Sequence, residues 1–278
     1  RLSPLLKKHL CCRFRKLALY KNLISRRFWF RSKIVVKYLW LASGLLAALS
    51  CTPVFAEIDD ANHSYLANFK QETASSEARE VADWIVHSRD NQRMPFLIVD
   101  KKNAKVFVFD SVGQILGASA ALLGMAVGDD SSRGIGQRKL SSIPVSERTT
   151  PAGRFVGSLS NNLRGMGVLW VDYDAAISLH RVITGNVKQQ RAQRLVSSTI
   201  SDNRISFGCI NVPAEFYDQL IEKTFEKTNG VIYVLPEIRS VQETFGSYVV
   251  DEEAVKALSA TSARANIDKS GSTVIKLR

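Results

Sequence analysis

The strongest constraint on the fold is a series of short apolar runs that begins after Pro95. Runs at 96–100 and 105–110 flank turn residues 101–104, as in a β-hairpin. Further runs of strand length are rich in β-branched and aromatic residues, and they lie at 114–119, after 149–155, and at 167–171, 175–180 and 231–235. This pattern predicts a mainly β fold, in which the run at 231–235 closes the sheet.

Helical spacing of apolar residues marks two stretches, and the tail from about 239 contains one further helical segment. One predicted helix covers 76–89, and a second covers 212–227 with Pro213 in its first turn. Residues 124–150 are rich in Gly, Ser and charge, and they are expected to form a long surface loop. Residues 184–204 are polar and basic, which indicates an inserted excursion.

Charge is distributed unevenly along the chain. The net charge is +12, but residues 1–37 hold twelve basic residues and no acidic one. The rest of the chain then has 26 basic and 26 acidic residues, so it is neutral. Composition therefore does not imply a phosphate-binding surface, and no nucleic-acid partner is expected.

An uncharged apolar segment at 38–56 follows the basic block and ends in the small-residue positions Val54 and Ala56. This order predicts an export signal over 1–56, cleaved after Ala56, with only transient membrane contact through that segment. A retained anchor is the alternative, because the segment is at the short end of spanning length. The start codon stays open, since the first methionine is Met94. A periplasmic or cell-envelope location is expected.

Cys209 is the only cysteine beyond the predicted export signal, which contains Cys11, Cys12 and Cys51. A lone thiol in an oxidising compartment has no disulfide to form within its own chain. Gly208 precedes it and the predicted helix follows, so the thiol is expected near a helix N-terminus, where its pKa is lowered. A catalytic nucleophile is favoured over a buried apolar cysteine or an intermolecular disulfide.

The motifs around Cys209 resemble, in their order, the L,D-transpeptidases of the YkuD type. Thr150-Pro-Ala-Gly-Arg-Phe155 precedes His180, and Ser206-Phe-Gly-Cys-Ile-Asn211 precedes a helix and a final strand. The resemblance covers about 95–236 and implies an L,D-transpeptidase-like β-sandwich catalytic domain with one helix after the nucleophile. The remaining segments are expected to be the export signal 1–56, a linker with a short N-terminal helix at 57–94, and a C-terminal tail at 237–278.

The resemblance also implies roles for individual residues. Cys209 is the nucleophile, His180 the general base, and the backbone carbonyl of Arg181 steers the imidazole. Acyl transfer further needs amides that hold the oxyanion, and those of Gly208 and Cys209 are expected to serve. The candidate substrate-binding residues are Ser206, Phe207 and Asn211.

Two departures from the family pattern concern the neighbourhood of the thiol. Phe207 stands where the family generally has His, two residues before the nucleophile. The spacing from His180 to Cys209 is longer than usual in the family, and the insertion at 184–204 accounts for it as a lid or a partner surface. Its basic residues are expected to form a solvated face, and they are Lys188, Arg191 and Arg194.

The function implied is that of an exported cysteine acyltransferase that forms a thioester with a peptidoglycan stem peptide and cross-links it to a second stem. Water as the acceptor would make it an L,D-carboxypeptidase, and a protein lysine would make it an anchoring enzyme. A non-catalytic peptidoglycan-binding envelope protein is the contrasting class. No cluster has metal-ligand spacing, so neither a metal nor a cofactor is expected.

Overall fold

The computed structural model describes residues 66–257. The predicted export signal and the end of the tail, 258–278, lie outside the described residues. The strands are β1 (Phe96–Asp100), β2 (Lys105–Phe109), β3 (Ile115–Ala120), β4 (Leu123–Gly124), β5 (Gly153–Asn161), β6 (Gly167–Asp172), β7 (Ile177–Arg181), β8 (Arg204–Ser206), β9 (Ile210–Val212) and β10 (Gly230–Val234). The α-helices are α1 (Ser76–Ser88), α2 (Arg191–Leu195), α3 (Ala214–Phe216), α4 (Glu222–Phe225) and α5 (Val241–Phe245).

Eight strands form one continuous sheet in the order β3-β2-β1-β10-β5-β6-β7-β9, and β4 pairs with β8. Strand β5 joins two halves of this sheet, because its first part pairs with β10 and its last part with β6. The mainly β fold is confirmed, as are the hairpin of β1 and β2 and the third strand β3.

The predicted place of the last strand is wrong. Strand β10 does not close the sheet at an edge; it lies between β1 and β5, parallel to the first and antiparallel to the second. All five of its residues are buried. The apolar run fits this position because a central strand with both faces covered has no side that needs polar residues.

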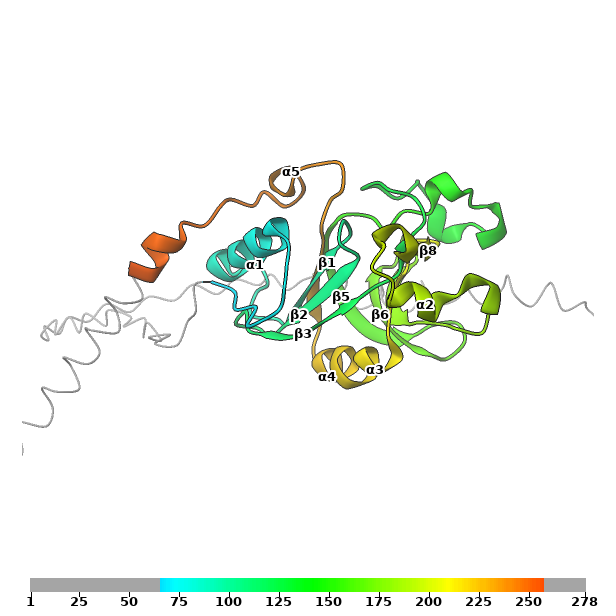
Figure 1. The fold of residues 1–278 in the computed structure, drawn as a ribbon, viewed down its shortest axis with the longest axis horizontal. Helices are drawn as coiled ribbons and strands as arrows, with labels where there is room; N and C mark the ends of the chain where they lie inside the picture. The colour runs from blue at the N-terminus through cyan, green and yellow to red at the C-terminus, as the bar shows by residue number, and fades with distance from the viewer. Residues whose placement is uncertain (1–65, 258–278) are drawn as a thin grey trace, which may run out of the picture. The chain divides into compact units, whose positions relative to one another are not determined.

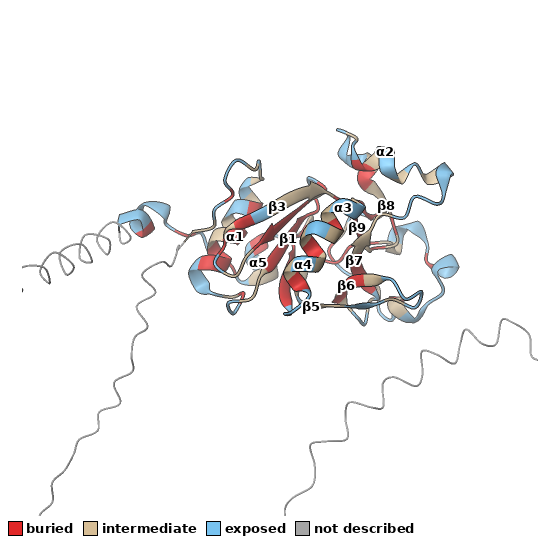
Figure 2. Cartoon of the chain, turned by 90° about the horizontal axis from the view of Figure 1, so that it is seen from below, coloured by how far each residue is buried: buried red, intermediate tan, exposed pale blue. Residues whose placement is uncertain are grey.

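Two hydrophobic clusters cover the two faces of the central strands. On one face, Phe96 and Ile98 of β1 pack with α1. On the other face, Leu97 and Val99 pack with the helical segment after β9 and with Leu179 of β7. Figure 1 shows the helices on either side of the strands, and Figure 2 shows the burial of the strands between them. The second cluster draws on both halves of the sheet, which is the packing of a sandwich.

Helix α1 confirms the first predicted helix and belongs to the same core as the sheet. The Ser75 side chain caps it by accepting from the backbone N–H of Ala78, and Arg89 ends it in the left-handed conformation. Trp84 and Ile85 are buried against the β1 face. The described part of the predicted linker is therefore packed into the domain.

The second predicted helix begins later than expected. Residues Ile210–Val212 form strand β9, parallel to β7, and α3 starts only at Ala214. A π-helical turn at Tyr217–Ile221 then separates α3 from α4. The two β-branched residues of β9 are buried in the sheet, which explains why strand pairing takes precedence over helix extension at this point.

The long loop 124–150 contains short 3-10 turns and is anchored by a buried charge cluster. Fully buried Lys101 donates to Asp129 at 3.1 Å and to the Thr150 carbonyl at 3.0 Å, and Glu237 lies 3.5 Å from it. Burial raises the pKa of Asp129, but three backbone N–H groups and Lys101 outweigh it and hold the pKa at about 2. Arg204 completes the cluster by pairing with Glu237.

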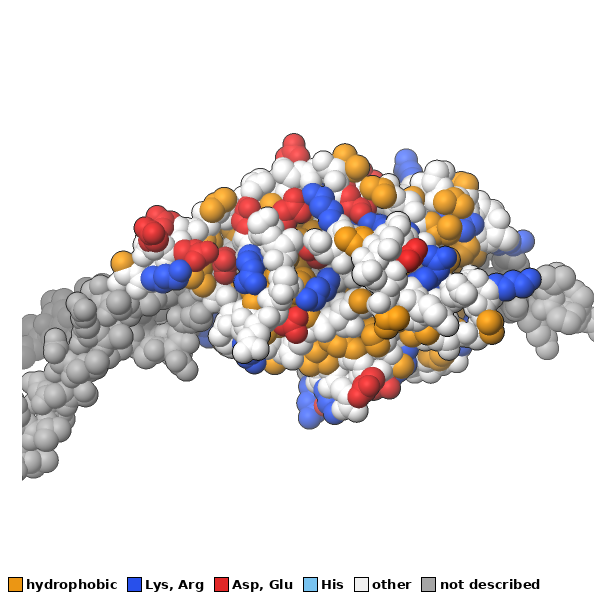
Figure 3. Space-filling model, viewed as in Figure 1, with side chains coloured by type: hydrophobic (Ala, Val, Ile, Leu, Met, Phe, Trp, Pro, Cys, Tyr) orange, Lys and Arg blue, Asp and Glu red, His pale blue; other side chains and the backbone are white. Residues whose placement is uncertain are grey.

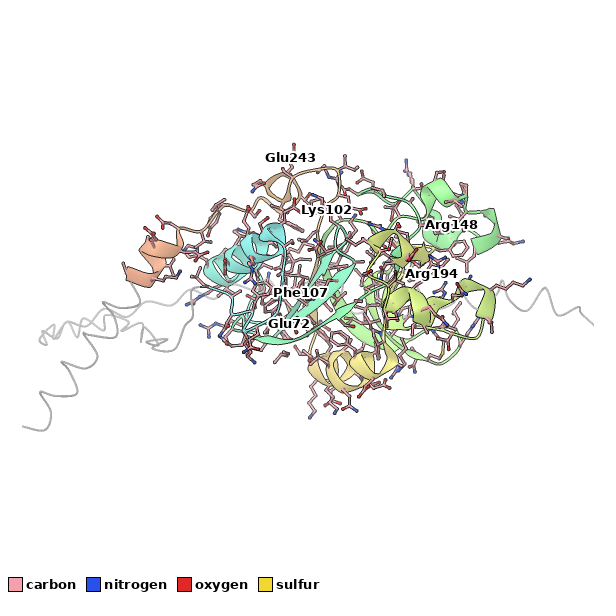
Figure 4. All side chains as sticks on the ribbon, viewed as in Figure 1. Glu72, Lys102, Phe107, Arg148, Arg194 and Glu243 are labelled. Carbon is pink, nitrogen blue, oxygen red and sulfur yellow. The ribbon has the colours of Figure 1, made fainter. Side chains whose placement is uncertain are left out.

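Replacement of Lys101 by methionine is expected to lower the free energy of unfolding by about 3–5 kcal/mol, because it leaves the buried Asp129 carboxylate without its cation. Urea denaturation of the full chain measures the change. Lys102→Met is the matched control, since exposed Lys102 only pairs with Glu77 and is expected to cost less than about 1 kcal/mol (Figure 4). Equal losses in the two variants would contradict a structural role for the buried cluster.

The surface of the described region mixes charges of both signs. On the face shown in Figure 3, Lys and Arg side chains are interspersed with Asp and Glu. Exposed apolar side chains also occur, including Leu140 and Ile183. Among the helices of residues 66–257, none is long and apolar enough to cross a membrane.

Candidate active site

Strands β7 and β9 bring four polar side chains together. Ser178 and His180 lie on β7, Asn211 lies on β9, and Cys209 lies just before β9. Their parallel pairing sets His180 opposite Asn211 and Leu179 opposite Ile210. Side chains alternate along a strand, so Ser178 shares a face with His180 while Leu179 is buried in the core. Cys209 lies just before β9, with its Sγ 3.7 Å from the Ser178 Oγ. The pairing therefore places the lone thiol beside the strand-end histidine.

His180 is oriented by the backbone of the next residue. Its Nδ1 is 2.7 Å from the carbonyl oxygen of Arg181, the contact implied by the resemblance. A carbonyl only accepts, so Nδ1 carries a proton and Nε2 is the nitrogen able to take one from a thiol. Burial lowers the pKa of His180, but the hydrogen bond and charge of Cys209 and the Arg181 carbonyl raise it above its ordinary value.

The Cys209 thiol has a lowered pKa. Burial opposes its ionisation, yet the hydrogen bond and charge of His180, with the backbone and hydroxyl of Ser178, bring the pKa below its ordinary value. The predicted helix N-terminus is not the cause, because β9 follows the cysteine and the helix begins at Ala214. The two shifts favour a thiolate paired with an imidazolium.

Ser178 is a site residue that the sequence analysis missed. Its place two residues before His180 on one strand is a signal for a shared face, because side chains repeat with a period of two. Serine is common on strands, however, and only the β7–β9 pairing brings this hydroxyl to the thiol.

Ser178→Ala is expected to raise the thiol pKa and to slow alkylation of Cys209 by iodoacetamide at pH 7 by about threefold to tenfold, the effect of one hydrogen bond. Peptide mass mapping identifies the alkylated cysteine. Ser160→Ala, on an exposed part of β5, is the control and should leave the rate unchanged. An unaltered rate in Ser178→Ala would show that the hydroxyl does not stabilise the thiolate.

The backbone conformation before the nucleophile requires Gly208. Its φ is +125°, and a Cβ there would lie 2.7 Å from the Thr149 carbonyl oxygen. Its N–H donates to the Ser206 hydroxyl at 3.0 Å within the loop, and the oxyanion role of this amide stays a prediction. The amide of Cys209 is the second candidate from the sequence analysis.

Ser206 is buried and supports the loop. Besides accepting from Gly208, its hydroxyl donates to the carbonyl of Cys209 at 2.6 Å. Thr150, in the Thr-Pro-Ala-Gly-Arg-Phe motif, donates to the Gly208 carbonyl at 2.8 Å and accepts from the Gly124 amide. Both hydroxyls hold the backbone around the thiol, so the motif positions the nucleophile.

Cys209 and His180 line a cleft of about 250 Å³. Its other lining residues come from the long loop, the insertion and the cysteine motif: Leu140, Ile183, Asn186, Gln189, Arg191, Ser206, Phe207 and Asn211. The insertion at 184–204 is thus part of the site, as one wall of the cleft.

Phe207 forms an apolar part of this wall. The Arg148 guanidinium lies over its ring at 4.0 Å and also donates to the Ile143 carbonyl (Figure 4). The residue that replaces the family's histidine therefore contributes no titratable group to the site. It links the cysteine motif to the long loop.

The predicted solvated face of the insertion is wrong for two of its three cations. Arg191 donates to the side-chain oxygen of Asn211 within the cleft. Arg194 donates to the carbonyls of Gln189 and Asp202, which fold the insertion back on itself (Figure 4). Lys188 is exposed, as expected. Across residues 66–257, no group of three or more His, Cys, Asp or Glu is arranged to hold a metal.

Solved structures resemble this chain only at low sequence identity and low TM-score. No protein-family model and no curated protein matches the chain. Similar solved structures include an Enterococcus faecium L,D-transpeptidase (14% identity, TM-score 0.30, 51% of this chain and 50% of that one) and a Xylanimonas cellulosilytica L,D-transpeptidase (14%, 0.31, 51% and 60%). Another is the Campylobacter jejuni helical cell shape determining protein (11%, 0.36, 67% and 62%).

The chain therefore spans about half to three-fifths of the length of these proteins.

Proposed function

We propose that this chain is a cysteine acyltransferase that acts on peptidoglycan stem peptides. The observation that carries the proposal is the pairing of Cys209 with His180 in an open cleft, with the thiol pKa lowered and the imidazole pKa raised. Such matched shifts are typical of reactive thiols, whereas an inert buried cysteine has a raised pKa. The motif order from Thr150 to Asn211 supports the substrate class.

In the first step, the Cys209 thiolate attacks the carbonyl carbon that follows the L-centre of the stem's diamino acid. A C–S bond forms and the C–N bond breaks, and the terminal D-residue leaves as an amine with the proton from His180 Nε2. In the second step, an amine of another stem gives a proton to His180 and attacks the thioester. A new C–N bond forms, the C–S bond breaks and the thiolate is regenerated.

We propose the same location for the protein as for its substrate, the cell envelope. Residues 1–56, with a basic block followed by an apolar segment, support export.

The test is incubation of the purified full-length chain with disaccharide-tetrapeptides, followed by mass spectrometry, with Cys209→Ala as the control. Cross-linked dimers that are missing from the control support the transpeptidase. Tripeptides without dimers would instead assign water as the acceptor, giving a carboxypeptidase. Unchanged tetrapeptide that still binds the protein would contradict catalysis and favour a binding protein.

A further inference from the structure

Arg191 is a cation without an acidic partner. Its Nε donates to the Gln189 side-chain oxygen at 2.7 Å and its Nη1 to that of Asn211, and both acceptors are neutral amides. In the described part of the chain, the Cys209 thiolate is the opposite charge that acts on its pKa, and the charge of Arg191 in turn lowers the pKa of His180. Several other partly buried arginines pair with carboxylates, including Arg154 with Asp90, Arg181 with Asp218 and Arg204 with Glu237. Arg148 and Arg194 donate to backbone carbonyls instead, but of these arginines only Arg191 lines the cleft.

The surroundings of Arg191 favour an anion in the cleft. Burial lowers the pKa of this guanidinium, which means that its charge is partly removed from water. A partly desolvated charge is unfavourable until an ion of opposite sign binds. Its Nη2 makes no hydrogen bond within residues 66–257, so donors remain for a ligand. A guanidinium binds carboxylates well because its donors match the two oxygens.

Arg191 also lies close to the reacting atoms. Asn211 accepts from it and in turn donates to the Cys209 carbonyl at 3.2 Å, with His180 Nε2 3.4 Å from the same amide nitrogen. In a peptide that ends one residue past the scissile bond, the α-carboxylate is separated from the attacked carbonyl only by the nitrogen and one α-carbon. The second carboxylate of the diamino acid lies at the far end of a longer side chain.

We propose that Arg191 binds the free α-carboxylate of the residue that leaves the donor peptide. This inference rests on the proposed acyl-transfer function and adds its specificity. The insertion then selects donors with a single residue beyond the scissile bond, because a longer or amidated peptide presents no carboxylate at that position. The enzyme is accordingly restricted to the ends of stems.

Calorimetric binding to full-length Cys209→Ala, which cannot turn over, tests this recognition. Three stem tetrapeptides are compared: the free acid, its C-terminal amide, and a free acid with lysine in place of the diamino acid. The amide is expected to bind about tenfold to a hundredfold more weakly than the acid, the range of a charged hydrogen bond. The lysine peptide should retain the tight binding. In the double variant Cys209→Ala, Arg191→Gln, the free acid should bind as weakly as the amide.

Two further variants separate the local effect from net charge and from folding. Lys188→Gln removes the same charge from an exposed position of the insertion and should keep the preference for the acid. Arg191→Lys keeps the charge and should retain part of the preference for the acid that Arg191→Gln loses. Equal Kd values for acid and amide, undetectable binding of the acid at millimolar concentration, or a preference that survives Arg191→Gln would overturn the inference. Weak binding of the lysine peptide would also overturn the inference, because the recognised carboxylate would then be the one on the diamino acid side chain.

The proposed function fails in a different way. If the chain with Cys209 intact turns over none of the peptides while Cys209→Ala still prefers the acid, the acyltransferase is excluded and the carboxylate site stands. If turnover occurs without any preference for the acid, the enzyme stands and the role of Arg191 is overturned.

Discussion

Cys209→Ala is expected to abolish turnover of the tetrapeptide, with kcat/KM at least about 10⁴-fold lower. The thiolate forms the bond to the acyl carbon, and alanine has no group that could form this bond. The acyl-enzyme mass expected for the unsubstituted chain should be absent. Steady-state kinetics and intact-protein mass spectrometry check the two effects.

The variant should remain folded, which makes the loss interpretable. The thiol lies 3.7 Å from the Ser178 hydroxyl and 3.7 Å from the Ala176 carbonyl, both long contacts, so its removal disturbs few hydrogen bonds. Thermal unfolding measured beside the kinetics provides the control. Turnover within tenfold of the unsubstituted chain would rule out Cys209 as the nucleophile.

His180→Gln is expected to lower kcat/KM by about 10²–10⁴-fold, the usual contribution of a general acid–base group. It should also shift the alkylation of Cys209 to higher pH. The thiol pKa is lowered by the hydrogen bond and charge of His180, so removal of the imidazole raises the pKa and leaves less thiolate at pH 7. The rate of iodoacetamide alkylation as a function of pH measures this shift.

The pH dependence of the unsubstituted chain follows from the same pair. The lowered thiol pKa extends the thiolate to lower pH and the raised pKa of His180 extends the imidazolium to higher pH, so the pair is favoured in a pH window where the two ranges overlap. Below this window the thiol is protonated, and above it the imidazole is neutral. His87→Gln is the control, because His87 is exposed on α1 and contacts Tyr248. An alkylation midpoint that stays in place in His180→Gln would contradict the pair.

The strands were predictable because their signals are local. The hairpin of β1 and β2 and helix α1 follow from apolar spacing within a few residues. The neighbours of β10 in the sheet were not predictable, since a strand with a continuous apolar run fits any position that is covered on both faces. The start of α3 was missed for a related reason: Ile210–Val212 lies in a strand only because β7 is there to pair with it.

The candidate site divides in the same manner. Cys209 and His180 stood out through their residue types and their order along the chain. Ser178 and Arg191 did not, because serine and arginine are ordinary on a strand and in a polar insertion. Hydrogen bonds of the folded chain bring Ser178 to the thiol and Arg191 to Asn211.

By itself, the sequence determined the mainly β class, the position of α1 and the presence of one thiol beyond the predicted export signal. Each of these depends on spacing between near neighbours or on composition. Only the tertiary structure decided that β10 is central, that Ser178 meets Cys209 and that Arg191 reaches Asn211. These contacts join residues far apart along the chain, and their formation depends on strand register and on the backbone path of the insertion, which local patterns do not specify.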